Sequence, residues 1–175
     1  MQEASRKTQE EEGIIEKVFI YLFSKFLLMN KKNILVFSTA LLVVILDQLT
    51  KFFIKQNFQL NQSIPIINKM LHLTYITNAG SAFGLFRGLN WFFIIFSIIV
   101  IIAIFYFINQ IKNNEKLMRF SVGLLLGGTI GNLIDRILYG AVIDFIDFRI
   151  WPVFNIADSA VTISIILLIF LLWKK

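Results

Sequence analysis

The sequence predicts an all-α polytopic membrane protein with four transmembrane helices, and three observations carry this prediction. Hydrophobic residues make up 57% of the 175-residue chain, and its mean hydropathy is +0.75, which exceeds the usual range of a soluble domain. The apolar residues fall in blocks long enough to cross a bilayer instead of at amphipathic spacing. The basic residues lie just outside these blocks.

We expect a single four-span domain over residues 31–175, with spans at about 34–54, 91–108, 117–139 and 155–173. Residues 1–30 are expected to be an N-terminal extension that is disordered at first. Its apolar part, residues 14–29, is short and interrupted by charges, which favours an interfacial helix over a span. The alternative interpretation is that translation starts at Met29.

The distribution of positive charge predicts the orientation in the membrane. Four crossings put both termini on one side, and clusters of lysines and arginines flank the spans on that side: Lys31, Lys32, Lys112, Lys116, Arg119, Lys174 and Lys175. The positive-inside rule makes this side cytoplasmic. The net charge of +6 is therefore a topology feature, and we expect no nucleic-acid partner. Residues 55–90 and 140–154 are expected outside, with the acidic residues at the outer ends of the spans.

The first span contains Asp47 and Lys51, which lie four residues apart on one helical face and can form an ion pair. After it, residues 70–77 partly alternate between apolar and polar, which predicts a short strand or hairpin. A turn of small residues follows from Asn78, and Gly80 in it allows the backbone to approach another group closely.

The third span contains four glycines and ends in a polar group. We expect Gly123 and Gly127 to be positions where a neighbouring helix packs closely. Asn132, Asp135 and Arg136 share a face near the outer end. Arg136 offers Asp135 a counter-charge, so this trio is interpreted as scaffolding or ligand binding instead of proton transfer.

Asp144 and Asp158 are the candidates for chemistry. They lie on either side of an aromatic, proline-containing stretch, residues 145–154, where the chain can fold back and bring them together. Two carboxyl groups in a poorly solvated pocket share one proton, so that one can act as a base on water while the other acts as an acid. With no cysteine in the chain, thiolate catalysis and disulfides are excluded. The spacing by itself leaves a structural role or an ion pathway open.

Five ordered motifs resemble the bacterial lipoprotein signal peptidase family, signal peptidase II. They are DQLTK at residues 47–51, NAGSAF at 78–83, GGTIGNLIDR at 127–136, VIDF at 142–145 and FNIAD at 154–158. The resemblance covers about residues 31–173. It implies an intramembrane aspartic endopeptidase that removes the signal peptide from prolipoproteins just before a cysteine carrying diacylglycerol.

The resemblance also implies roles for single residues and for the surroundings. Asp144 and Asp158 match the catalytic pair, and the residues expected to bind substrate or support the site are Asp47, Lys51, Asn78, Gly80, Asn132, Asp135, Arg136 and Asn155. No metal and no other cofactor is expected. The expected partners are the diacylglyceryl prolipoprotein and membrane lipids, with the protein a monomer in the bacterial plasma membrane and its active site at the outer leaflet. A small extracytoplasmic β-cradle and a short helix are expected within residues 55–90. The connection from Asp144 to Asp158 is shorter than in many members.

Two other functions are compatible with parts of the sequence. Asp144 and Asp147 form a D-x-x-D pattern that could bind Mg²⁺ in a lipid phosphotransferase, although Asp158 then has no role. Alternatively, the acidic residues could line the path of a small ion or solute transporter. The position of these acids at one interface counts against a transporter.

Overall fold

The protein is described by a computed structural model that covers residues 31–80, 89–112 and 114–174. Residues 35–174 of the described part belong to one compact unit. A 3₁₀ turn, η1 (Lys31–Asn33), leads into the first long helix. The elements are then α2 (Ile34–Asn57), β1 (Ser63–Ile67), β2 (Leu71–Asn78), α3 (Asn90–Phe107) with its 3₁₀ extension η3 (Ile108–Gln110), α4 (Lys116–Tyr139), β3 (Val142–Asp147) and α5 (Ile156–Trp173).

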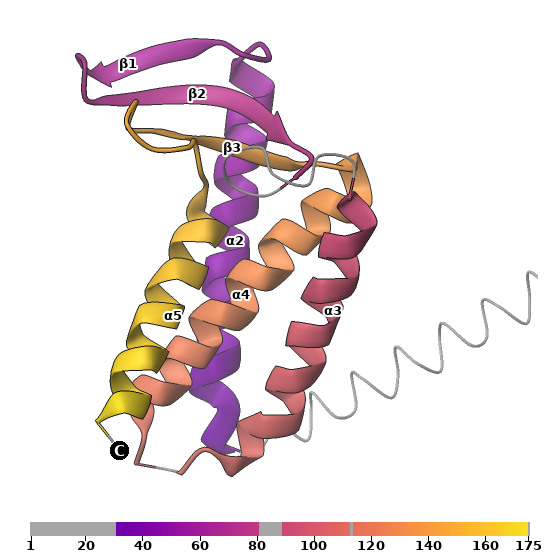
Figure 1. The fold of residues 1–175 in the computed structure, drawn as a ribbon, viewed down its shortest axis with the longest axis vertical. Helices are drawn as coiled ribbons and strands as arrows, with labels where there is room; N and C mark the ends of the chain where they lie inside the picture. The colour runs from indigo at the N-terminus through magenta and orange to yellow at the C-terminus, as the bar shows by residue number, and fades with distance from the viewer. Residues whose placement is uncertain (1–30, 81–88, 113, 175) are drawn as a thin grey trace, which may run out of the picture. The chain divides into compact units, whose positions relative to one another are not determined.

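The four long helices confirm the predicted fold class. Each is long and apolar enough to cross a membrane, from the 18 residues of α5 to the 24 of α2 and α4. Their outer faces expose large apolar side chains, such as Phe52 at 62% and Ile102 at 62%. A water-soluble protein does not normally expose apolar surface on this scale. The helices run alternately up and down, and α2 starts at the end of the bundle where the C-terminus lies (Figure 1).

A three-stranded antiparallel sheet in the order β1-β2-β3 covers the other end of the helices (Figure 1). Strand β2 agrees with the strand predicted at residues 70–77, and β1 makes it a hairpin. Strand β3 follows α4 and pairs with β2, with Ile76 opposite Asp144. Strand β3 was not predicted from the sequence, because it is only six residues long. The short helix expected within residues 55–90 has no counterpart at 58–80, and residues 81–88 lie outside the described part.

Helix α4 is the central element because its glycines let two other helices approach. Gly123 and Gly127 face α2, where a Cβ on Gly127 would lie 2.6 Å from the carbonyl oxygen of Ala40. Gly128 faces α5, and a Cβ there would lie 2.5 Å from the carbonyl oxygen of Ala157. Such distances are too short for any side chain, so these glycines set the spacing of the bundle.

A methyl group at position 127 tests this packing. Gly127→Ala gains about 1 kcal/mol of helix propensity, but overpacking against backbone atoms costs about 1–3 kcal/mol. We therefore expect a lower melting temperature in detergent, measured by the thermal unfolding of the purified protein. Leu138→Ala, at a position 63% exposed on the same helix, is the control and should melt near the wild-type temperature. An unchanged or raised melting temperature for Gly127→Ala would contradict the close approach of α2.

Candidate active site

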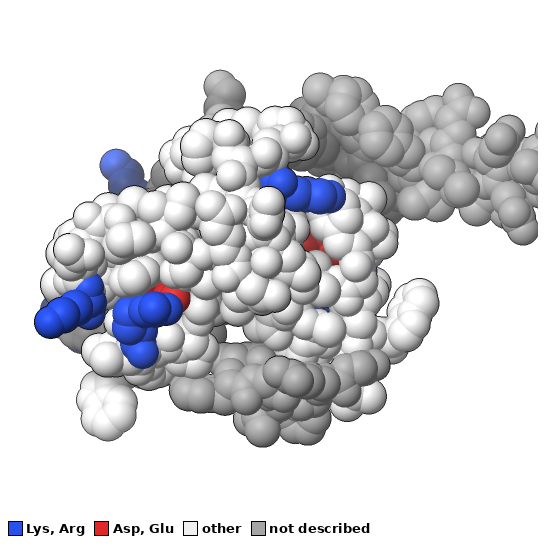
Figure 2. Space-filling view, turned by 90° about the horizontal axis from the view of Figure 1, so that it is seen from above, with Lys and Arg blue, Asp and Glu red and all other residues white. Residues whose placement is uncertain are grey.

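The acidic residues predicted from sequence converge where α2, α4, β3 and α5 meet below the sheet. Asp47, Asp135 and Asp144 are almost completely buried, with at most 1% of their surface exposed. Asp158 is partly exposed. In the view from the sheet end (Figure 2), acidic side chains therefore show only as small red areas on a mostly white surface. Carboxylates buried to this extent require partners.

Asp144 is positioned by strand β3. The pairing of β3 with β2 brings Asn78 next to it, and the Asn78 Nδ2 donates to Asp144 Oδ2 at 3.1 Å. The backbone N–H of Gly80 donates to Asn78 Oδ1 at 3.0 Å, which fixes the amide so that its NH₂ group faces Asp144. The second oxygen, Asp144 Oδ1, accepts from Asn155 Nδ2 at 2.7 Å. Both carboxyl oxygens are thus held by side-chain amides.

Asp158 is positioned by the start of α5. Asn155 is the N-cap of this helix, accepting from the Asp158 backbone N–H at 2.8 Å, while its own N–H donates to Asp158 Oδ2 at 3.3 Å. This reciprocal arrangement is a capping box. Asp158 Oδ1 accepts from Asn132 Nδ2 of α4 at 2.7 Å. Asp158 therefore has a fixed orientation that depends on two asparagines.

The chain between the two aspartates folds back as a short bridge. Ile146 and Phe154 exchange backbone hydrogen bonds of 2.8 and 3.1 Å, which brings Asn155 beside Asp144. Asn155 Nδ2 also donates to Asn132 Oδ1 at 3.1 Å. Asp144, Asn155, Asn132 and Asp158 consequently form one continuous hydrogen-bonded chain. The connection from Asp144 to Asp158 is short, but it is long enough to let both side chains take part in this hydrogen-bonded chain.

The environment of Asp144 strengthens the binding of a proton to its carboxyl group. Burial, and next the negative charge of Asp158, raise the pKa of Asp144 to about 7, although the hydrogen bonds from Asn78 and Asn155 act in the opposite direction. A carboxyl group with a pKa near 7 can exchange protons with a substrate at physiological pH.

A buried cluster of opposite charges lies behind the aspartates. Lys51 Nζ is 2.8 Å from both Asp47 Oδ2 and Asp135 Oδ2. The ion pair between Asp47 and Lys51 within α2 confirms the pairing predicted from their four-residue spacing. The counter-charge of Asp135, however, is Lys51 of another helix instead of the adjacent Arg136. The Arg136 guanidinium lies 4.9 Å from the centre of the Phe93 ring.

Arg136 lines a cleft next to the two aspartates. The cleft has a volume of about 580 Å³, and the polar residues at its wall include Asn78, Asp144 and Asp158. Its remaining wall is largely apolar and comes from α3, the loop after β3 and the first turns of α5. Of the described lining residues, Arg136 is the cation that a molecule entering the cleft would meet, whereas Lys51 is 2% exposed and does not line the cleft.

Three further polar contacts, made by Gln48 and Thr74, were not predicted from the sequence. Gln48, next to Asp47, donates to Asp135 Oδ1 and to the carbonyl oxygen of Gly131, each at 3.1 Å. On the sheet, Thr74 Oγ1 donates to Asp147 Oδ2 at 2.7 Å. Gln48 is a polar residue within an apolar span, and this could have been used to predict that its side chain contacts other polar groups inside the bundle. The contact of Thr74 depends on strand pairing, which the sequence does not specify.

Asp147 does not join Asp144. On a strand, residues three apart point to opposite faces, and Asp147 instead bonds Thr74 and Arg149, the latter at 3.0 Å. Although burial acts to raise the pKa of Asp147, these hydrogen bonds lower it below the ordinary value. The D-x-x-D pattern therefore does not form a pair of ligands for one cation.

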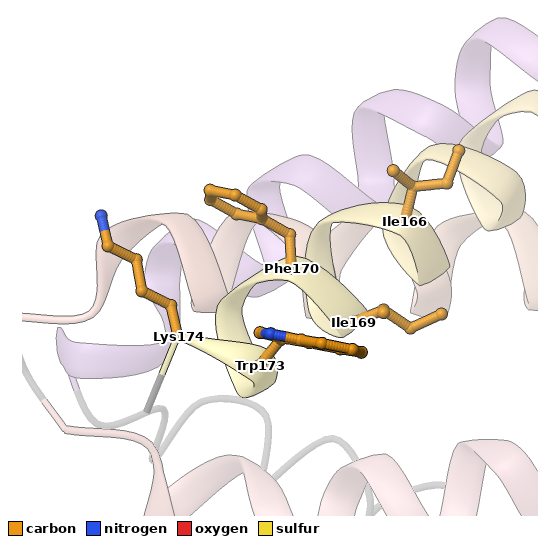
Figure 3. A pocket seen from close by; sticks show the side chains of 5 residues that line it. All are labelled: Ile166, Ile169, Phe170, Trp173 and Lys174. Atoms are coloured by element: carbon orange, nitrogen blue, oxygen red, sulfur yellow. The ribbon is translucent and has the colours of Figure 1, made fainter.

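A second groove lies at the other end of α5. It is lined by Ile166, Ile169, Phe170, Trp173 and Lys174, whose side chains project from the last turns of the helix (Figure 3). An apolar wall with a tryptophan and a lysine at its end is typical of a lipid-facing helix near the membrane interface. None of its described lining residues is an aspartate, glutamate or histidine, so the groove is not a second candidate for catalysis.

Comparison with known sequences identifies the family. The sequence profile described as Signal peptidase (SPase) II matches residues 39–174. The lipoprotein signal peptidase of Halothermothrix orenii is 43% identical over 143 residues, which cover 81% of this chain and 97% of that protein. The lipoprotein signal peptidase of Bacillus subtilis strain 168 is 42% identical over 77% of this chain and 90% of its own length.

Solved structures agree with this result. A bacterial membrane enzyme determined by the in meso method at 2.3 Å resolution has a TM-score of 0.75, with 42% identity over 79% of this chain and 87% of that chain. Another at 1.9 Å has a TM-score of 0.73, with 41% identity over 80% and 93%. The matches define the class, a multi-pass membrane protein that is an aspartic peptidase. The chain belongs to the signal peptidase II family, and the resemblance of its motifs is confirmed.

Proposed function

We propose that this protein removes the signal peptide from diacylglyceryl-modified prolipoproteins, cutting just before the lipidated cysteine. The observation that carries the proposal is the hydrogen-bonded chain from Asp144 through Asn155 and Asn132 to Asp158. It holds two carboxyl groups, one of them with a pKa of about 7, at the wall of one cleft. The printed function of the relatives, lipoprotein signal peptidase, gives the substrate class.

The proposed reaction uses a water molecule as the nucleophile. Asp144 and Asp158 share one proton, because two buried carboxylates do not both ionise easily. The ionised carboxyl takes a proton from water as the oxygen attacks the carbonyl carbon of the scissile amide. The protonated carboxyl donates to the carbonyl oxygen, which gives a tetrahedral diol. The carboxyl that took the proton from water then donates it to the amide nitrogen as the C–N bond breaks, and a diol hydroxyl returns a proton to the other carboxylate, which restores the pair. The asparagines keep both carboxyl groups oriented, which lowers the entropic cost of reaching the transition state.

The remaining predicted residues have supporting roles in this proposal. Arg136 at the cleft wall binds a backbone carbonyl of the substrate, for which its several donors are suited. Asn78 and Gly80 orient Asp144, while Asn132 and Asn155 orient both aspartates. The apolar residues of the cleft, among them Phe93 and Val161, suit an apolar signal peptide and acyl chains.

The proposal extends to topology and domain organisation. Lys112 follows the end of α3, Lys116 and Arg119 lie in the first turn of α4, and Lys174 follows α5, so these four basic residues belong to the end of the bundle away from the sheet. Lys55 and Arg136, in the last turns of α2 and α4, are the described basic residues at the sheet ends of these helices. The positive-inside rule assigns the end away from the sheet to the cytoplasm, so the cleft opens at the outer leaflet of the plasma membrane. Residues 31–175 form the monomeric peptidase domain, and residues 1–30 are an extension that catalysis does not need.

The experiment that tests the function uses a synthetic prolipoprotein peptide with a diacylglyceryl cysteine. The purified protein in liposomes should release the signal peptide and leave the lipidated cysteine at the new N-terminus, as identified by mass spectrometry. The same peptide without the lipid is the control and should be cut at least about 10-fold more slowly, because it lacks the apolar contacts. Cleavage should be unaffected by EDTA. Loss of cleavage in EDTA, with recovery on adding Mg²⁺, would instead favour a site that depends on a divalent metal ion, as in the lipid phosphotransferase alternative.

The pH dependence of cleavage follows from the raised pKa of Asp144. Below about pH 7 the pair keeps its shared proton, and above it the proton is lost, so that no carboxyl can act as the acid. We therefore expect kcat/KM to fall as the pH rises through about 7, and to fall again at low pH when both carboxyls are protonated. A rate that is constant from pH 5 to pH 9 would contradict a shared proton.

A further inference from the structure

We propose that Lys51 is a positioning residue of the cleavage reaction, because it fixes the orientation of Asn132 and supplies the positive charge behind the aspartate pair. This inference rests on the proposed function. Lys51 does not touch the cleft, and its ammonium group lies on the far side of Asn132 from Asp158. Its effect on the reaction is therefore transmitted through other side chains.

The first part of the argument concerns the direction of an amide. Lys51 Nζ lies 3.1 Å from Asn132 Oδ1, and an ammonium group can only donate hydrogen bonds. Asn132 must consequently present its oxygen to Lys51 and its NH₂ group to Asp158 Oδ1, at 2.7 Å. Without Lys51, Asn132 Oδ1 keeps only the bond from Asn155, and the amide loses the charged donor that determines its orientation.

The second part concerns the backbone on both sides of the site. Asp47 Oδ1 accepts the backbone N–H of Ala157 at 2.9 Å, and Asp135 Oδ2 accepts that of Ile143 at 3.0 Å. These residues directly precede Asp158 and Asp144. Lys51 joins the two accepting carboxylates, at 2.8 Å from each. A single ammonium group thus connects the supports of both aspartates.

The third part is the balance of charge. Among the residues that the structure describes, the charged groups facing the pair are Asp47 and Lys51 from α2, Asp135 and Arg136 from α4, and Asp144 and Asp158 themselves from β3 and α5. With one proton on the pair, three negative charges face two positive ones. Removing Lys51 leaves a single cation, Arg136, which lines the cleft. In a buried site the added negative charge favours protonation of the pair.

The test compares three variants in the lipopeptide assay, with kcat, KM and the pH–rate profile as readouts. Lys51→Met keeps the shape of the side chain and removes its charge and donors. Asp47→Asn removes a negative charge from the same cluster. The double variant Asp47→Asn/Lys51→Met restores the net charge, and it replaces an ion pair by neutral groups, which limits the cost of leaving an unpaired charge buried. The amount of folded protein is measured for each.

We expect Lys51→Met to lower kcat by about 100-fold, as for a misplaced catalytic group, with KM within about threefold. Both limbs of its profile should move to higher pH by about one unit, and those of Asp47→Asn to lower pH. The double variant should regain the pH limbs of the wild type but not its rate, since Asn132 still lacks the charged donor, Lys51, that fixes its orientation. The proposal is wrong if all variants that fold have the same pH–rate profile and their loss of activity is proportional to their loss of folded protein. The role of Lys51 would then be structural. A wild-type protein that cleaves no lipopeptide would instead refute the proposed function, on which this role depends.

Discussion

Asp144→Asn and Asp158→Asn will each reduce kcat for the lipopeptide by at least about 10⁴-fold, the size of loss seen when an acid or base is removed from a catalytic set that acts as a unit. An amide side chain is nearly the same size as a carboxyl group, but it can neither accept the proton of a water molecule nor donate one to a leaving amine. The pair would then have one carboxyl group where the reaction needs two. The measurement is single-turnover cleavage, so that product release does not mask the chemical step.

A loss of activity is meaningful only if the variants fold. Both keep a polar group of the same shape and add no buried charge, because the remaining aspartate alone carries the single negative charge of the pair, so their melting temperatures should not fall far below that of the wild type. Asp147→Asn is the matched control, since it lies three residues from Asp144 on the same strand and bonds Thr74 and Arg149 instead of the cleft residues. It should cleave within about threefold of the wild-type rate. Near-normal cleavage by the Asp144 or Asp158 variant would reject the assignment of the pair.

The fold was predictable where the signal is local. Long apolar blocks identify four helices, because each must bury its backbone polar groups within its own hydrogen bonds in lipid. The alternation before Asn78 predicts β2 for a similarly local reason. Strand β3 was missed because only six residues, Val142–Asp147, form it, and most are buried on both faces, which removes the alternation.

The site was predictable in part. The family motifs singled out the residues around the cleft, and the Asp47–Lys51 pair followed from helical spacing. The ion pair of Asp135 with Lys51 could not be predicted from helical spacing, because the two residues lie on different helices and only helix packing brings them together. The same holds for Ala157, whose N–H reaches Asp47 across 110 residues of sequence. Contacts of this range follow from the close approach of α2, α4 and α5, which the glycines of α4 permit.

Asn155→Ala will lower both stability and activity, because this asparagine serves two structures at once. Its oxygen caps α5 by accepting from the backbone N–H of Asp158, and its NH₂ group donates to Asp144 Oδ1, Asn132 Oδ1 and the carbonyl oxygen of Ile143. Loss of an N-cap costs about 1 kcal/mol, and each buried acceptor left without its donor costs about 1–3 kcal/mol. The expected results are a clearly lower melting temperature and a loss of about 100-fold in kcat through misplacement of the aspartates.

Asn155→Ser separates these two functions of the residue. A serine at the N-cap still accepts from the Asp158 N–H, so the start of α5 is preserved, but it is too short to donate to Asp144. Its melting temperature should therefore lie between those of Asn155→Ala and the wild type, whereas its kcat should be as low as that of Asn155→Ala. If the rate recovered together with the melting temperature, the cap of α5 would account for the whole effect. The direct bond from Asn155 to Asp144 would then have no part in catalysis, and the orientation of Asp144 would depend on Asn78 and the strand pairing of β3.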